Sequence, residues 1–161
     1  MDKTPPAFSA PGFGKRGEEG HLAYLLRQAG VAFRLRMDQA LADLGVTPPQ
    51  FSVLVMADAY PGLSNADAAR LSLLTPQTVS VIVGNLKRRG LVISRPHAVH
   101  GRIQHLDLSE QGKAILARCK ERVTGLEAQM AAILSPDEDR IVRRWLVAIA
   151  RGMDAPAAVD D

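Results

Sequence analysis

The residues best suited to chemistry lie in one short stretch, TPQTVS, which covers residues 75–80. Its polar members Gln77, Thr78 and Ser80 carry amide and hydroxyl groups that donate and accept hydrogen bonds, and the stretch has no charge. Side chains of this kind read the edges of DNA bases when the first turns of a helix present them to the major groove. The alternative is that they are ordinary solvated positions on a helix.

A basic segment surrounds this stretch. Residues 70–105 contain six Lys or Arg and no Asp or Glu, whereas the rest of the chain holds 14 cations against 17 anions. The six cations are Arg70, Lys87, Arg88, Arg89, Arg95 and Arg102. A basic block on a mildly acidic body indicates a surface that faces a polyanion, with nucleic acid as the candidate. Charge alone does not decide between that partner and a solvated surface, and Lys87, Arg88 and Arg89 also suit the C-terminus of a helix.

The longer stretch TPQTVSVIVGNL, residues 75–86, alternates polar and apolar side chains like a strand but has the end signals of a helix. Thr75 followed by Pro76 is typical of a helix start, and Gly90 after three cations is typical of a helix end. On a 3.6-residue period, one apolar face comprises Val79, Ile82, Val83 and Leu86. We therefore expect a helix that leaves the polar residues, Val81 and Gly84 on its outer side.

Similar signals predict the elements before this helix. Apolar residues at helical spacing run through residues 22–44, and Gly45 follows as a stop. Thr47 with Gln50, and Ser64 with Asp67, have the spacing of capping boxes that open two further helices. Residues 60–64, YPGLS, are expected to form a turn, and the helix after it to end near residue 71.

The elements after it are two short strands and two helices. Residues 91–95 and 103–108 have strand-like composition, and the loop between them predicts a β-hairpin. Ser109 then caps a long helix with an apolar stripe that reaches residue 134; about 25 residues span nearly 40 Å, which suggests a helix shared with a partner chain. A capping box at Ser135 opens a last helix, in which Trp145 belongs to the apolar face.

The composition argues against several classes of protein, including membrane-spanning and secreted proteins. No apolar run approaches the roughly 18–20 residues that span a bilayer, and the N-terminal residues lack the apolar core of a secretory signal. The single cysteine, Cys119, forms no intrachain disulfide; on an apolar stripe it is expected to be a buried inert thiol, with redox sensing as the alternative. We expect a cytoplasmic protein with no membrane partner, no cofactor, no bound metal and, for want of any catalytic motif, no enzymatic activity.

A short helix, a tight turn, a second helix and a β-hairpin, in this order, predict a winged helix-turn-helix. The expected fold class is mainly α with a small β-hairpin wing. Residues 46–108 form the DNA-binding lobe, and residues 20–45 and 109–153 form a helical dimerisation region. Residues 1–19 are predicted to be a flexible arm and residues 154–161 a flexible tail.

Four segments, taken together, resemble one family, the MarR-type transcription regulators. They are GVTPPQFSVL (residues 45–54), PGLSNADAARLSLLTPQTVS (61–80), GLVISR (90–95) and LDLSEQGKAIL (106–116). The resemblance implies a homodimer with intertwined terminal helices that binds palindromic operators in double-stranded DNA and represses. Many such proteins release DNA when a small phenolic or aromatic acid, or an oxidant, is sensed. A winged-helix module that binds protein through Val81 and its uncharged neighbours is the alternative.

The resemblance and the helical pattern together assign candidate sites. The candidate DNA contacts are Ser64, Thr75, Pro76, Gln77, Thr78, Ser80, Val81, Lys87, Arg88, Arg95, His97, His100 and Arg102. The candidate effector contacts, with ordinary packing as the alternative, are His21, Tyr24, Arg27, Phe51, Met56 and Tyr60. The chain departs from the family pattern at three places. In the wing, His100 replaces an aspartate whose ion pair holds the loop, and Gly101 stands where the family often has a second arginine. Val81 replaces an arginine, and Lys87 replaces an acid. We expect these changes to alter operator preference or phosphate contact.

Overall fold

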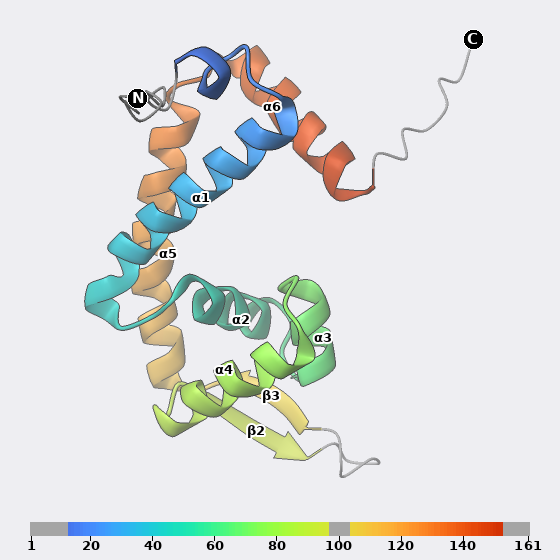
Figure 1. Ribbon diagram of the computed structural model, residues 1–161. Helices are drawn as coiled ribbons and strands as arrows, with labels where there is room; N and C mark the ends of the chain where they lie inside the picture. Colours follow the sequence, from blue (N-terminus) through green and yellow to red (C-terminus); the bar gives the residue numbers. More distant parts are fainter. Residues whose placement is uncertain (1–12, 97–103, 153–161) are drawn as a thin grey trace, which may run out of the picture. The chain divides into compact units, whose positions relative to one another are not determined.

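The structure is a computed structural model that describes residues 13–96 and 104–152 (Figure 1). Contacts divide the chain into two compact units, Met1–Cys119 and Lys120–Asp161. The elements in chain order are η1 (Gly14–Arg16), α1 (Leu22–Leu41), η2 (Ala42–Leu44), α2 (Pro48–Ala59), β1 (Leu63–Ser64), α3 (Asn65–Leu71), α4 (Pro76–Arg88), β2 (Val92–Pro96), β3 (Gln104–Leu108), α5 (Glu110–Ala131) and α6 (Pro136–Ala150). The boundary between the units falls within α5.

Predicted capping signals mark the starts of α2, α3, α4 and α6 in the structure. The Thr47 hydroxyl accepts a hydrogen bond from the Gln50 backbone N–H at 3.4 Å, and the Gln50 side chain accepts from the Thr47 N–H at 3.1 Å. A third predicted capping box opens α6 at Ser135. Gly45 and Gly90 adopt φ values of 61° and 69°, the left-handed conformation that ends a helix at little steric cost.

The sheet contains one strand that the sequence did not predict. Its order is β1-β3-β2, and all pairs are antiparallel. Residues 60–64 were expected to form only a turn, but Leu63 and Ser64 pair with Leu106 and His105 of β3. A strand of two residues is too short to show alternation. The two predicted strands are confirmed. The first begins at Val92, one residue later than predicted, and the second covers Gln104–Leu108 of the described residues.

The core of the first unit confirms the predicted inner face of α4. Val79, Ile82, Val83 and Leu86 are all buried. They lie among apolar residues of α2, α3 and the sheet, and Figure 1 shows these elements gathered around α4. The buried residues of those elements include Val53, Leu54, Ala57, Ala68, Ala69, Val92, Leu106 and Leu108, and Leu91 just before β2 is buried with them.

The apolar stripe of α5 is shorter than predicted. Leu116 and Cys119 are buried as expected, but the helix ends at Ala131. Ile133, which was assigned to the stripe, therefore lies beyond the helix and is 81% exposed. The reason is that an apolar spacing continues across the helix end, so periodicity alone does not reveal where the helix stops.

No single helix of the described residues has the length and apolar character to cross a membrane. One bent pair, Leu22–Leu44 with Pro48–Ala59, meets that test by length and composition only.

Candidate nucleic-acid interface

The first turn of α4 is built by Thr75 and Pro76. The Thr75 hydroxyl accepts a hydrogen bond from the Thr78 backbone N–H at 3.2 Å, and the two hydroxyls share a second bond of 2.8 Å. Pro76, at the first helical position, has no N–H to leave unsatisfied. The Thr78 side chain, a candidate base contact, is therefore also part of the cap.

The outer side of α4 is uncharged through its first two turns. Gln77, Thr78, Ser80 and Val81 are all exposed, and Val81 is 64% exposed. The side chains of Gln77 and Ser80 form no hydrogen bond with any described residue. These two side chains are thus held out by a core-anchored helix with their donors and acceptors available, which is the arrangement that groove reading requires.

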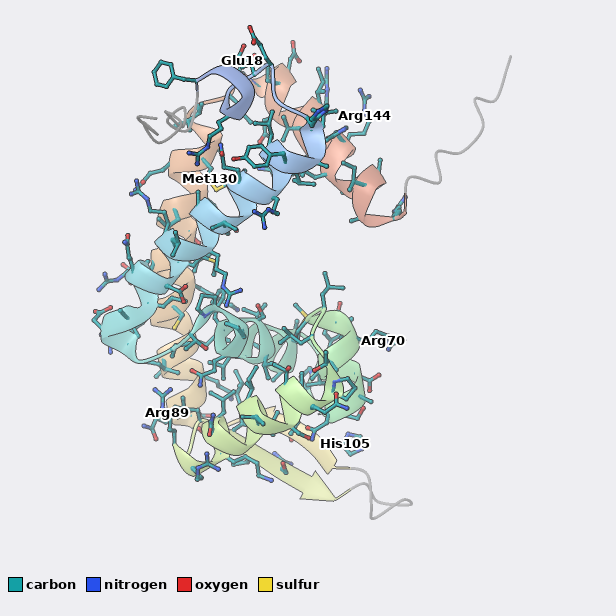
Figure 2. The ribbon with its side chains drawn as sticks, viewed as in Figure 1. Glu18, Arg70, Arg89, His105, Met130 and Arg144 are labelled. Carbon is teal, nitrogen blue, oxygen red and sulfur yellow. The ribbon has the colours of Figure 1, made fainter. Side chains whose placement is uncertain are left out.

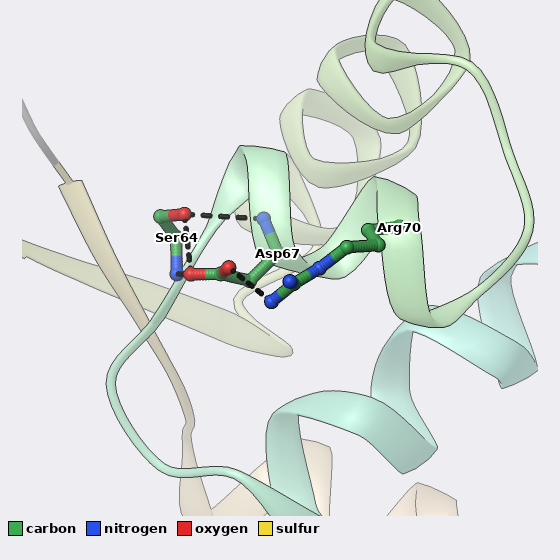
Figure 3. A network of polar contacts seen from close by, with 3 residues as sticks. All are labelled: Ser64, Asp67 and Arg70. Carbon is green, nitrogen blue, oxygen red and sulfur yellow. Dashed lines mark hydrogen bonds and ion pairs between the residues drawn. The ribbon is translucent and has the colours of Figure 1, made fainter.

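The start of α3 is a closed hydrogen-bond network (Figure 3). The Ser64 hydroxyl donates to Asp67 Oδ2 at 2.7 Å and accepts from the Asp67 backbone N–H at 3.1 Å. The Ser64 backbone N–H also donates to Oδ2 at 3.3 Å, and the two bonds that Ser64 donates to this carboxylate, followed by the charge of Arg70, lower the pKa of Asp67. Arg70 Nη2 lies 3.0 Å from Asp67 Oδ1. Ser64, a candidate DNA contact, therefore has its hydroxyl engaged in capping α3.

The cations at the end of α4 have different partners. Arg89 lies just after α4 and is labelled in Figure 2. Its Nη1 donates to the Gly45 carbonyl at 2.6 Å and its Nη2 to the Leu44 carbonyl at 3.4 Å, so Arg89 joins α4 to the end of η2. Arg88 instead donates from Nη2 to Asn85 Oδ1 on its own helix. Lys87 is exposed. Arg89 therefore has a structural role that the sequence did not reveal.

Asp107 of β3 connects the two strands of the wing to the turn before β1. Asp107 Oδ2 lies 3.2 Å from Arg95 Nε, and its Oδ1 accepts a hydrogen bond from the Gly62 backbone N–H at 3.2 Å. His105 Nδ1 forms a further hydrogen bond with the Gly62 carbonyl. The sequence did not single out Asp107. Alternation along the strand, with Leu106 and Leu108 buried, was the only signal that it faces outward. His97, His100 and Arg102 lie outside the described residues.

Two of the candidate effector contacts border one cavity of the described residues. Tyr24 and Arg27 line a space of about 180 Å³ on α1, together with Arg16, Gln28 and Val31. Arg16 Nε donates to the Tyr24 hydroxyl at 3.1 Å, and the Gln28 Oε1 atom is buried without a hydrogen-bond partner. His21 precedes α1 and does not line this cavity, and neither do the three candidates on or just after α2, which are Phe51, Met56 and Tyr60.

Cys119 is the expected buried thiol. Its side chain is fully buried and forms no disulfide. Burial raises the pKa of this thiol, and the positive charges of Arg118 and Arg89 offset only part of that effect. A protonated thiol is a poor nucleophile, so the side chain has the properties of a small apolar core group. Among the described residues, no group of His, Cys, Asp or Glu could hold a metal ion.

Comparison with known proteins agrees with this geometry. A sequence model described as the MarR family matches residues 44–103. The HTH-type transcriptional repressor Rv2887 of Mycobacterium tuberculosis is 34% identical over 130 residues, which are 80% of this chain and 93% of the relative. The solved structure of that protein with salicylic acid has 31% identity and a TM-score of 0.65, and covers 82% of this chain and 98% of its own.

A second solved structure gives the same fold. The transcriptional repressor CouR, bound to a 23-mer DNA duplex, has 27% identity and a TM-score of 0.78, and covers 86% of this chain and 98% of its own. These relatives are transcription regulators, which confirms the predicted fold class and the expectation that the chain is not an enzyme. The chain belongs to the MarR family of winged helix-turn-helix transcription regulators.

Proposed function

We propose that the protein is a homodimeric repressor that reads a palindromic operator with α4 and releases it when a small aromatic acid binds. The observation that carries the proposal is the outer side of α4, where Gln77 and Ser80 are exposed and uncharged on a helix whose inner face is buried. The likeness to a repressor with 34% identity supports it.

The expected docking follows from the ends of α4. Its N-terminal half enters the major groove, so that Gln77 and Ser80 reach base edges while the free N–H groups of the first turn face a phosphate. In a two-fold symmetric dimer the two helices meet successive major grooves, with half-site centres roughly 34–36 Å apart. Arg95, whose Nε lies 3.2 Å from Asp107 Oδ2, is held at the base of the wing as an ion pair.

A dimer accounts for the apolar face of α6 in the second unit. This helix has no buried residue, yet its apolar side chains gather on one face. They are Ile141, Val142, Trp145, Leu146 and Ile149. Apolar faces of this size are normally covered, and a second copy is the partner that the family resemblance implies.

The dimer is tested by its mass in solution. Leu146→Glu places a charge on the apolar face of α6, whereas Arg144→Glu changes a charge on the opposite side of the same helix, because residues two apart in a helix point about 200° from one another. Light scattering should show a dimer for the parent and for Arg144→Glu, and a monomer for Leu146→Glu with weakened operator binding. A monomeric parent at the concentrations that bind DNA would overturn the dimer.

The proposed effector site is the cavity on α1. Arg16 and Arg27 supply the two guanidinium groups that suit a carboxylate, while Tyr24 and Val31 offer ring and aliphatic contacts. Its volume of about 180 Å³ fits a single-ring acid. The relative solved with salicylic acid supports this ligand class.

Operator binding is tested by selection from random DNA followed by mobility shifts across a range of salt concentrations. The parent should enrich a palindrome and lose affinity steeply as salt rises. Gln77→Ala should reduce discrimination between operator and unrelated DNA, while Gln129→Ala, the same change on the exposed surface of α5, should not. Absence of DNA binding at low salt would favour the protein-interaction alternative instead.

The effector is tested on the protein–operator complex. Salicylate or p-aminosalicylate should dissociate it at concentrations that also raise the melting temperature of the free protein, because a ligand that binds the folded state stabilises it. Arg27→Ala should raise the concentration required without weakening operator binding. If neither acid changes either measurement, this site and ligand class are wrong, while DNA binding stands.

A further inference from the structure

The second half of α4 has exposed residues on its outer side that take no part in the proposed base contacts of Gln77 and Ser80. Residues seven apart on a helix lie nearly above one another, since two turns take about 7.2 residues. Gln77 and Gly84 form one such pair, and Val81 and Arg88 form another. These four residues therefore make up the outermost line of α4, opposite the buried face that anchors the helix.

Arg88 folds back along this line. Its Nη2 donates to Asn85 Oδ1, and its Nη1 lies 3.7 Å from the position that a Cβ of Gly84 would occupy. The guanidinium group is therefore at the level of Gly84, one turn before the Arg88 Cα, as expected from the lean of helical side chains toward the N-terminus. Gly84, which weakens the helix by about 1 kcal/mol relative to alanine, leaves that part of the outer line without a side chain.

The charge of Arg88 is oriented without being neutralised. Two other arginines of the basic segment lie within 3.2 Å of carboxylates, Arg70 at Asp67 and Arg95 at Asp107. Arg88 is bonded to a neutral amide. A guanidinium has five N–H donors, so the bond to the amide leaves an edge free for a bidentate contact. Because the side chain is already held, less conformational entropy is lost when that contact forms.

We propose that Asn85 and Arg88 form a second base-reading element, in which Arg88 binds the O6 and N7 atoms of a guanine and Asn85 positions it. This rests on the proposed operator binding by α4. Bidentate contact with guanine is the pairing that arginine geometry favours in the major groove. Gln77 and Gly84 are about 10 Å apart along the axis, so with α4 along the groove the guanine lies about three base pairs from the base that Gln77 reads.

The test measures base preference at every operator position, using the operator that the parent selects from random DNA. Arg88→Ala should reduce the preference for guanine at one position about 5- to 150-fold and leave other positions unchanged. Arg88→Lys keeps the charge but replaces the rigid planar fork of N–H groups by a single ammonium group, which Asn85 does not hold in the same geometry. It should weaken the same preference while the dependence of affinity on salt stays as in the parent. Asn85→Ala should weaken the preference several-fold, also without a change in the salt dependence.

Three controls separate this role from others. Lys87→Ala removes a candidate phosphate contact from the same helix end, so it should weaken binding to all sequences and lower the salt dependence without shifting the preference at any one position. Gly84→Ala, whose Cβ would make an ordinary contact, should preserve the preference, whereas Gly84→Leu should abolish it at the Arg88 position. Thermal unfolding of each variant shows whether the fold persists.

Two outcomes overturn the proposal. If Arg88→Lys and Arg88→Ala keep the base preferences of the parent, then Arg88 is a phosphate contact or a helix-end cation. If the parent enriches no operator at all, the proposed function fails first and this element fails with it. The first outcome leaves operator reading by Gln77 intact, so the two failures are distinguishable.

Discussion

Gly112, in the first turn of α5, is the position where a single methyl group should do most harm. A Cβ at this residue would lie 2.0 Å from the carbonyl oxygen of Leu91 and 3.0 Å from its carbonyl carbon. Both are backbone atoms, which cannot swing aside as a side chain can. An ordinary contact is 3.4–4 Å, so Gly112→Ala must push the start of α5 away from Leu91 by more than 1 Å.

That displacement disturbs several interactions at once. The Leu91 carbonyl accepts a hydrogen bond from the Ser109 N–H at 3.1 Å, and the Ser109 hydroxyl donates to the Gly90 carbonyl at 2.6 Å. Leu91 is also fully buried. Overpacking costs about 1–3 kcal/mol and a weakened hydrogen bond about 1 kcal/mol, against a gain of about 1 kcal/mol from replacing a helical glycine. The net expectation is a loss of about 1–3 kcal/mol.

The matched control is Gly125→Ala in the same helix, where a Cβ would meet no atom within 4 Å. This variant should gain about 0.5–1 kcal/mol from helix propensity. Urea unfolding followed by circular dichroism, at one fixed protein concentration, measures both changes. The two variants should therefore differ by about 2–4 kcal/mol. If Gly112→Ala were as stable as the parent, the close approach of α5 to Leu91 would be wrong.

Three further changes test other features. Leu73 is 92% exposed in a left-handed conformation with φ 54°, so Leu73→Gly should stabilise the fold by about 0.5–1 kcal/mol in urea unfolding; a destabilised variant would contradict this strain. The pKa of Asp67 is lowered from 3.8, so its bonds with Ser64 stabilise the fold at pH values above 3.8, and this contribution is lost as pH falls through the lowered pKa. Asp67→Asn should therefore have a smaller free energy of unfolding than the parent near neutral pH, and the difference should vanish in acid. A difference that persists in acid would refute this reasoning. Cys119 should react with a thiol reagent only after unfolding, and rapid labelling of the folded protein would revive the redox alternative.

The sequence predicts best what depends on neighbouring residues. The capping boxes at Thr47, Ser64 and Ser135 involve partners three residues away, and all three are formed. The inner face of α4 follows from helical periodicity in the same way. Local hydrogen bonds and a regular repeat leave clear patterns in the sequence, so the helices and their starts were predictable.

Interactions across long stretches of sequence left no such pattern. The bonds from Arg89 to Leu44 and Gly45 and the contact between Asp107 and the Gly62 N–H join residues more than 40 positions apart. A glycine in a helical stretch, such as Gly112, reads in sequence only as a weak helix position. What makes it necessary is the carbonyl of Leu91, which only the folded chain brings near.

The joint between Arg89 and η2, made by two hydrogen bonds to the Leu44 and Gly45 carbonyls, bears on how the salt dependence of DNA affinity is interpreted. Arg89 bonds to two backbone carbonyls rather than to a carboxylate, at the end of a helix where carbonyl groups lack helical partners. Dissolved ions screen a pair of opposite charges much more than a short bond from a charge to a fixed dipole. The joint should therefore hold at salt concentrations that release DNA. A decline in affinity with rising salt would then measure lost phosphate contacts, not a loosening of α4 from the end of η2.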